Sequence, residues 1–283
     1  MLIYNYCERG GNVEVLYLFL IGFLAASIGS LIGIGGGIII IPFLLYFNQH
    51  TSFFSEVTPQ FAVGTSTLTV VFTALSASLA NYKHKTISYK MGAYLFVGAI
   101  PGAIIGAWTN GKLDFSGFSL YFGMFLITVS IILMFKDKLK PIKNPYRAIT
   151  MQYVDKNENV HEYTFSPIIG IPLSFAVGFL SGIFGIGGGV LLVPAMMVFF
   201  RVPPSVAAAT SMFVILLSST VNTVQHTFYG NILWMYALAL IPGAWIGGKV
   251  GPMIMQKINA KTFVLIFRVT LILVGLQLIT EGL

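Results

Sequence analysis

The chain has 283 residues, of which 56% are hydrophobic and only 9% charged, whereas about 25% of the residues of an ordinary soluble domain are charged. With a mean hydropathy of +0.86, this composition excludes a soluble globular protein and predicts an all-α polytopic membrane protein. The single cysteine, Cys7, excludes an internal disulfide and a cysteine-based metal site. The formal charge of +7 does not indicate a nucleic-acid partner, because the basic residues lie between apolar segments. In a membrane protein this pattern indicates which loops are cytoplasmic.

Apolar segments follow one another in two groups of five. The first group is 15–32, 33–47, 58–81, 91–110 and 116–135, and the second is 167–184, 185–200, 203–227, 232–250 and 262–280. These bounds predict an N-terminal extracytoplasmic tail at 1–14, a first transmembrane repeat at 15–135, a cytoplasmic linker at 136–166 and a second transmembrane repeat at 167–283. Within the linker, residues 146–163 are polar and alternating, which we interpret as an ordered cytoplasmic flap.

The two halves carry matching phrases in the same order, which indicates an internal repeat. GIGGGIIIIP at 33–42 matches GIGGGVLLVP at 185–194. GTSTLTV at 64–70 matches ATSMFVI at 209–215, and IPGAIIG at 100–106 matches IPGAWIG at 241–247.

Charge indicates how the two repeats are oriented, because loops rich in lysine and arginine stay in the cytoplasm. If Lys83, Lys85 and Lys90 lie inside, the basic linker also lies inside and the second half starts from the cytoplasm. Equivalent segments then run in opposite directions, so we predict two inverted-topology repeats of about five helical segments each. Both termini are expected to be extracytoplasmic in a multi-pass protein.

The second segment of each half is short. Residues 33–47 would form a helix of about 22 Å, less than the roughly 30 Å of a hydrocarbon core. We therefore predict that the first two segments of each repeat form a glycine-interrupted hairpin of shortened helices.

Short, glycine-interrupted segments at corresponding places in inverted halves indicate the substrate site of a transporter. Glycines let the chain break and restart a helix, whose free N–H groups and positive dipole end form an anion site. The predicted backbone donors are Gly33, Gly35, Gly36, Gly37, Gly185, Gly187, Gly188 and Gly189. A second interpretation is that these glycines only allow close helix packing.

Hydroxyl groups in the third segment of each half are further candidates for the anion site. We assign Thr65 and Ser66 in the first half and Thr210 and Ser211 in the second, because uncharged donors can bind an oxyanion inside a membrane. The alternative is that such hydroxyls bond to carbonyls of their own helix.

Other polar and kinking residues have secondary roles in this interpretation. Pro42, Pro101, Pro194 and Pro242 are candidates for gating or hinge positions. His226 is a candidate proton-linked group, with the alternative that it is a satisfied interfacial residue. We predict no catalytic residues, no metal and no cofactor, because no clustered Cys, His or carboxylate groups stand at suitable spacings.

The paired GIGGG segments followed by proline, the Thr-Ser pair in each third segment and the two IPGA phrases resemble the sulfite exporter TauE/SafE family, also called the toluene sulfonate uptake permeases. The resemblance extends over about 15–280. It implies a secondary transporter of the plasma membrane, whose partner is a small inorganic or organosulfur anion such as sulfite, thiosulfate or sulfoacetate.

The function expected from the residues and the resemblance together is transport of such an anion across the plasma membrane by alternating access. An anion channel that uses the same site is one alternative, and a membrane-embedded enzyme is a second. The sequence leaves the exact substrate, the direction, the coupling ion and the oligomeric state open.

Overall fold

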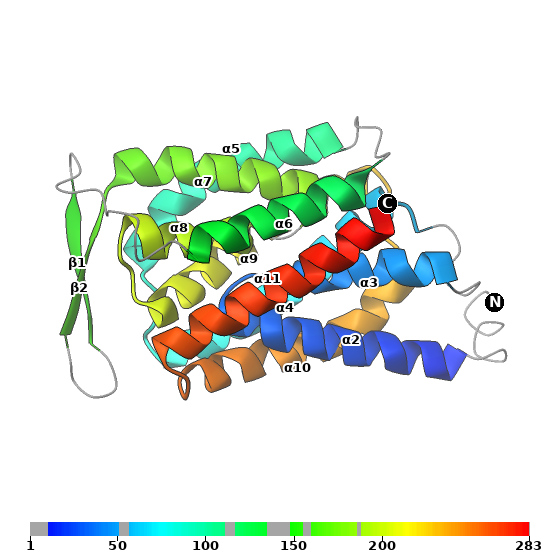
Figure 1. The fold of residues 1–283 in the computed structure, drawn as a ribbon, viewed down its shortest axis with the longest axis horizontal. Coiled ribbons are helices and arrows are strands. Elements are labelled where there is room, and N and C mark those ends of the chain that lie inside the picture. The colour runs from blue at the N-terminus through cyan, green and yellow to red at the C-terminus, as the bar shows by residue number, and fades with distance from the viewer. Residues whose placement is uncertain are drawn as a thin grey trace.

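The computed structural model of the protein describes residues 11–50, 57–110, 117–134, 148–154, 160–185 and 188–282. In these residues the chain forms a bundle of helices with one small two-stranded sheet at its end (Figure 1). The elements are α2 (Gly11–Ile32), α3 (Gly37–His50), α4 (Pro59–Lys83), α5 (Tyr89–Asn110), α6 (Phe118–Met134), β1 (Ile149–Val154), β2 (Val160–Phe165), α7 (Pro167–Phe184), α8 (Gly189–Phe199), α9 (Pro204–Phe228), α10 (Trp234–Met255) and α11 (Ala260–Gly282). Each predicted apolar segment corresponds to one helix, which confirms the all-α membrane fold.

Helix length separates two classes of segment. In the described part of the chain, 7 helices are long and apolar enough to cross a membrane, namely α2, α4, α5, α7, α9, α10 and α11. The helices α3, α6 and α8 are shorter, and α8 has only 11 residues. A helix of that length spans about 16 Å, roughly half of a hydrocarbon core. The predicted shortening of the second segment in each half is therefore confirmed.

The linker contains a β-hairpin, which the predicted all-α fold does not include. β1 and β2 pair antiparallel, with Met151 opposite Tyr163 and Ile149 opposite Phe165. Tyr163 and Phe165 are buried, whereas Gln152 and Glu162 on the other face are exposed. The alternating polarity within 149–154 and 160–165 is thus the two-residue period of a strand pair with one face packed on the protein. The hairpin lies at the left-hand end of the bundle in Figure 1.

Helices pack in pairs that join the two halves. α2 packs along α10 and α5 along α7, while α4 contacts α9 and α6 contacts α11. Glycines bring the backbones together: a Cβ atom at Gly102 would lie 2.1 Å from the Phe175 carbonyl oxygen, and one at Gly243 would lie 2.1 Å from that of Phe19. Close approach through small residues is typical of helix contacts in membranes. Each first helix therefore packs on the fourth helix of the other half.

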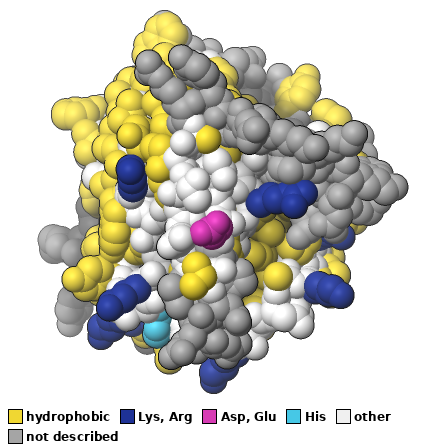
Figure 2. Space-filling model, turned by 90° about the vertical axis from the view of Figure 1, so that its left-hand side faces the viewer, with side chains coloured by type: hydrophobic (Ala, Val, Ile, Leu, Met, Phe, Trp, Pro, Cys, Tyr) yellow, Lys and Arg dark blue, Asp and Glu magenta, His cyan; other side chains and the backbone are white. Residues whose placement is uncertain are grey.

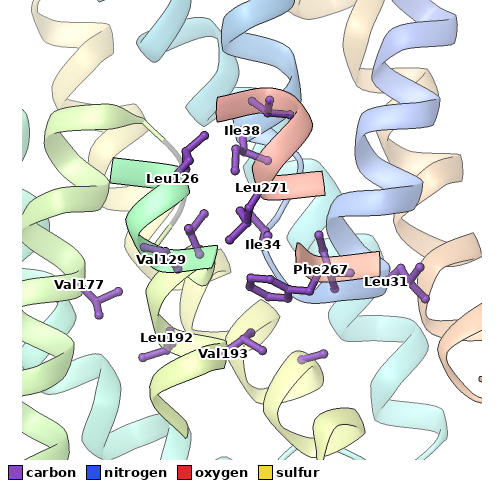
Figure 3. Close-up of a cluster of buried hydrophobic side chains, with 14 of the residues drawn as sticks. Leu31, Ile34, Ile38, Leu126, Val129, Val177, Leu192, Val193, Phe267 and Leu271 are labelled. Carbon is purple, nitrogen blue, oxygen red and sulfur yellow. The ribbon is translucent and has the colours of Figure 1, made fainter. Parts of the chain in front are cut away.

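The large apolar core lies between α6, α11 and the short helices. Figure 3 shows Leu126 and Val129 of α6, with Phe267 and Leu271 of α11, around Ile34, which follows α2. All five side chains are buried. α6 and α11 therefore cover the connections between the short helices and their partners.

Basic side chains gather at the hairpin end of the bundle (Figure 2). They come from the turns between helices, where Lys85, Lys90, Arg201, Lys257 and Lys261 are exposed. At the opposite end, the described turn between α9 and α10 contains no lysine or arginine. The charge is therefore distributed asymmetrically along the helix axes.

The glycine contacts between α5 and α7 lead to a stability prediction. Gly102→Leu would place a side chain against the Phe175 backbone, so we expect the free energy of unfolding to fall by about 2 kcal/mol or more, as overpacking of a tight contact does. The measurement is thermal unfolding of the purified protein in detergent. Ala93→Leu, at an exposed position of the same helix, is the control and should change little. Equal unfolding temperatures for the two variants would contradict this packing.

Candidate functional site

Two breaks in the helical backbone form the centre of the candidate site. After α2 ends at Ile32, Gly33, Gly35 and Gly36 have φ values of 79°, 92° and 90°. In the second half Gly185 and Gly188 have φ values of 69° and 80°. These left-handed conformations carry little cost for glycine and are strained for other residues. In the first half GIGGG therefore folds as a turn that ends one helix and starts a second, and in the second half Gly185 ends α7 and Gly188 precedes α8.

The two breaks touch each other in the interior. A Cβ atom at Gly189 would lie 2.1 Å from the Gly33 carbonyl oxygen and 2.6 Å from the Ile34 Cα atom. The third helix of the opposite half lies against each break: a Cβ at Gly33 would lie 2.7 Å from Ala208 Cα, and one at Gly185 would lie 3.0 Å from Val63 Cα. Every described residue of both breaks is buried. The fold thus brings together segments that lie about half the chain apart.

Serine side chains hold each break from the opposite half. Ser211 Oγ donates a hydrogen bond to the Gly33 carbonyl oxygen at 2.8 Å. Its counterpart Ser66 Oγ lies 3.2 Å from the Gly185 carbonyl oxygen and 3.0 Å from that of Val63 in its own helix. Both serines are fully buried. The two matched phrases are therefore bonded across the halves in the same way.

The neighbouring threonines accept hydrogen bonds from backbone amides. Thr65 Oγ1 accepts from the N–H of Leu233 at 3.0 Å, and Thr210 Oγ1 accepts from the N–H of Ser88 at 3.0 Å. Leu233 directly precedes α10, and Ser88 directly precedes α5. Each threonine therefore fixes the start of the fourth helix of the opposite half. The hydroxyls predicted as anion donors thus have structural partners in this conformation.

Backbone N–H groups at the helix starts are the remaining donors of the predicted set. The amides of Ile34 and Gly35 donate to the Gly29 carbonyl oxygen, at 2.7 and 3.1 Å. α3 begins at Gly37 and α8 at Gly189, and the first amides of a helix have no acceptor within it. Gly188 is the N-cap of α8 and, as a glycine, has no side chain that could cap these amides. The positive ends of two helix dipoles are therefore buried at the breaks.

An apolar contact closes the space beside the first break. A Cβ at Gly35 would lie 2.9 Å from Val70 Cγ1 and 3.4 Å from Ile215 Cγ2. Val70 and Ile215 occupy equivalent positions of the two matched phrases. Both belong to a small buried cluster, separate from the main core, that α4 and α9 form with Ala74, Ala77 and Met212.

The remaining predicted residues have different surroundings. Gly187 lies outside the described residues. Pro42 and Pro194 are buried inside α3 and α8, whereas Pro101 and Pro242 lie on exposed faces of α5 and α10. Their gating or hinge role stays a prediction.

A polar stripe on α9 contains buried atoms without partners. Ser219, Asn222 and His226 follow one face of the helix at spacings of three and four residues. They are at most 1% exposed, and no described residue bonds to Ser219 Oγ, to either polar atom of the Asn222 amide or to either His226 ring nitrogen. Buried polar atoms normally have partners, so such a stripe calls for an explanation. The matched positions of the first half are Ala74, Ala77 and Asn81.

Two further polar residues near the second break were not predicted. Ser181 Oγ is buried without a partner among the described residues, and it would lie 3.6 Å from a Cβ at Gly188. Asn110 donates through Nδ2 to the Ile183 carbonyl oxygen at 2.6 Å, while its Oδ1 has no described partner. The signal that could have found Asn110 is the difference between the repeats, since Gly251 occupies the matched position.

Comparison with known proteins identifies the family. The family model described as "Sulfite exporter TauE/SafE" matches residues 18–278. The chain belongs to the TauE/SafE family.

Similar proteins cover nearly the whole of this TauE/SafE member. The probable membrane transporter protein YunE of Bacillus subtilis is 48% identical, over 95% of this chain and 99% of its own length. The probable membrane transporter protein YjnA of the same organism is 25% identical, over 93% of this chain and 98% of its own. A probable membrane transporter protein of Xylella fastidiosa strain Temecula1 is 25% identical, over 92% and 91%. No solved structure matches the chain.

The bond from Ser211 to the first break leads to a second prediction. Ser211→Ala should lower the free energy of unfolding by about 1 kcal/mol or somewhat more, because the buried Gly33 carbonyl loses its donor. Thermal unfolding in detergent measures the effect. Ser218→Ala is the control, since the Ser218 hydroxyl bonds only weakly to its own helix, at 3.3 Å from Ile215 O. A Ser211→Ala variant no less stable than the control would show that this bond does not support the break.

Proposed function

We propose that this multi-pass membrane protein is a secondary transporter that moves a small sulfur-containing anion across the plasma membrane by alternating access. The anion is sulfite, thiosulfate or an organosulfonate such as sulfoacetate. The observation that carries the proposal is the meeting of two glycine breaks, each at the start of a short helix, in the buried centre of the bundle. The family description and the names of the relatives support transport.

The chemistry at the breaks favours an anion. Helix starts offer N–H donors and positive partial charge without a lysine or arginine, whose burial in a membrane is costly. The chain's carboxylates lie outside the central parts of the helices and would not repel the ligand. Of the predicted binding residues, Gly33, Gly35, Gly36, Gly37, Gly185, Gly188, Gly189, Ser66 and Ser211 lie at or beside the two breaks, whereas the hydroxyls of Thr65 and Thr210 face the starts of α10 and α5.

The two halves are proposed to form an inverted repeat in the membrane. In support, α2 and α7, the first helices of the two halves, run in opposite directions along the bundle (Figure 1). Lys85, Lys90 and Arg201 lie at the hairpin end, which by the positive-inside rule supports a cytoplasmic location for that end and an extracytoplasmic location for the opposite end.

The polar stripe of α9 is proposed to line the outward path of the anion. Ser219, Asn222 and His226 follow α9 away from the hairpin end toward the turn after Phe228. Polar atoms buried without described partners are costly in the observed conformation, and water or substrate would satisfy them in an outward-open one. His226 is the candidate proton-linked group on this path.

An anion channel and a membrane-embedded enzyme are the two alternative functions, and each requires different properties of the site. An anion channel could use the same breaks but would conduct without saturation. A membrane-embedded enzyme would need clustered reactive groups, and the described residues include no group of three or more His, Cys, Asp or Glu side chains. The names of the family and the relatives also indicate a transporter rather than an enzyme.

Flux into proteoliposomes tests the proposed transport. We expect saturable uptake of radiolabelled sulfite, thiosulfate or sulfoacetate, and loss of that uptake in Gly188→Asn. Asparagine tolerates a positive φ and its side chain would cap the amides of α8, so the donors for the anion would be occupied. A pH gradient should accelerate uptake by the native protein and not by His226→Gln.

Gly230→Asn is the matched control for Gly188→Asn. Gly230 has a φ of 70° and no atom within 4 Å of a Cβ built on it, and it lies in the turn between α9 and α10. Anion uptake by the Gly230→Asn variant should equal that of the native protein. Unsaturable passage of chloride would favour a channel. Equal uptake by both asparagine variants would show that the breaks do not bind the transported anion.

Chemical accessibility tests the outward path. In a Cys7→Ser background, Ser219→Cys and Asn222→Cys should react with an impermeant methanethiosulfonate reagent added outside, and saturating sulfoacetate, which does not react with the reagent, should slow the labelling. Thr220→Cys is the control, because Thr220 is exposed on the outer face of α9 and should stay unreactive in lipid. Absence of labelling at both stripe positions, with and without a substrate gradient, would contradict this path.

A further inference from the structure

A cavity lies between the β-hairpin and the turn that joins α4 to α5. Its volume is about 430 Å³, and its lining includes Lys85, Ser88, Lys90, Met151, Tyr153 and Tyr163. This volume lies within the range of small-molecule sites, about 300–1,000 Å³, and is many times the roughly 30 Å³ of one water. The cavity could therefore hold an organic molecule larger than an inorganic oxyanion.

The lining of this cavity is basic and rich in hydroxyl groups. Lys85 and Lys90 contribute the charge, and the described lining residues include no aspartate or glutamate. Glu162, on the outer face of β2, accepts a hydrogen bond from Gln152 Nε2 at 2.8 Å. Burial raises the pKa of the Tyr163 phenol, an effect that a side-chain hydrogen bond with Ser88 opposes, so that Tyr163 keeps its proton and can donate. Lysines with hydroxyl donors suit a phosphate or a similar acidic group.

The position of the cavity suits contact with lipid headgroups. It lies at the basic end of the bundle, beside the exposed side chains of Tyr82 and Tyr89. Tyrosines are enriched where a membrane meets water, and basic side chains there attract anionic lipids. Met151, Ile87 and Val206 supply apolar lining for the part of the ligand that carries no charge.

Ser88 connects this cavity with the candidate substrate site. Its backbone N–H donates to Thr210 Oγ1 at 3.0 Å, and its hydroxyl donates to Met151 Sδ at 3.4 Å. One residue thus bonds both to the hairpin and to the Thr-Ser pair of α9. A ligand held between the hairpin and the turn would restrain this connection.

We propose that the cavity under the β-hairpin is a second binding site, distinct from the glycine breaks, for the phosphate ester group of an organic ligand. Lys85 and Lys90 bind the phosphate, Tyr163 donates a hydrogen bond to it, and the apolar lining contacts the esterified body. The phosphate ester comes either from an anionic lipid headgroup or from a soluble metabolite. This site does not depend on the transported anion.

Binding to the full-length protein, purified in detergent and freed of lipid, tests the proposal. The probes are glycerol 3-phosphate and short-chain dihexanoyl phosphatidylglycerol, titrated by calorimetry. We expect saturable binding of at least one probe, weakened at least tenfold in Lys85→Ala/Lys90→Ala. Binding of the lipid alone would identify a headgroup site, and binding of both probes would identify a site open to soluble esters.

A control variant with the same loss of charge distinguishes binding in the cavity from nonspecific electrostatic attraction to the basic end of the bundle. Lys83→Ala/Lys257→Ala removes two exposed lysines from the same end of the bundle that do not line the cavity, and its Kd should stay within twofold of the native value. Equal weakening in both double variants, or no saturable binding of either probe, would overturn the proposal. Because the assay measures no flux, its outcome is independent of whether sulfite is transported.

Discussion

Irregular backbone inside a membrane protein must find its hydrogen bonds within the protein, and this requirement organises the centre of the bundle. Two helices end and restart at buried glycines, where lipid offers no donor or acceptor. The Gly33 carbonyl receives its bond from Ser211, and the Gly185 carbonyl lies within reach of Ser66. Because each serine belongs to the other half, neither break is satisfied until both halves are folded together.

The repeat explains why so much of the architecture could be predicted. Segment positions followed from hydropathy, and the shortness of α3 and α8 followed from the distance between GIGGG and the next polar stretch. Duplication also directed attention to the Thr-Ser pairs, whose serines the fold brings to the breaks. The hairpin was recognised only as an ordered flap, because two short alternating strands give a weak signal beside long apolar helices.

The parts that could not be predicted are those that depend on which groups meet. Thr65 and Thr210 accept from backbone amides, a role that no residue pattern distinguishes from donation to an anion. Asn110 lies far from the second break in the sequence and reaches it only through the packing of α5 on α7, which brings it to the Ile183 carbonyl oxygen. A comparison that sought differences between the halves, rather than matches, would have pointed to Asn110 and would have added Ser219 and Asn222 to His226, which is already a predicted candidate.

The exchange of helix partners between the halves has an architectural consequence. The glycine faces of α5 and α10 bury the first helices of the opposite half, through the Gly102–Phe175 and Gly243–Phe19 contacts. The repeat seen in the sequence is therefore not an autonomous folding unit, because either half alone would leave its first and fourth helices without their main partners. In the proposed transport cycle we expect the interlocked pairs α2 with α10 and α5 with α7 to move as units, so the two sequence repeats and the two packed units are different divisions of the same chain.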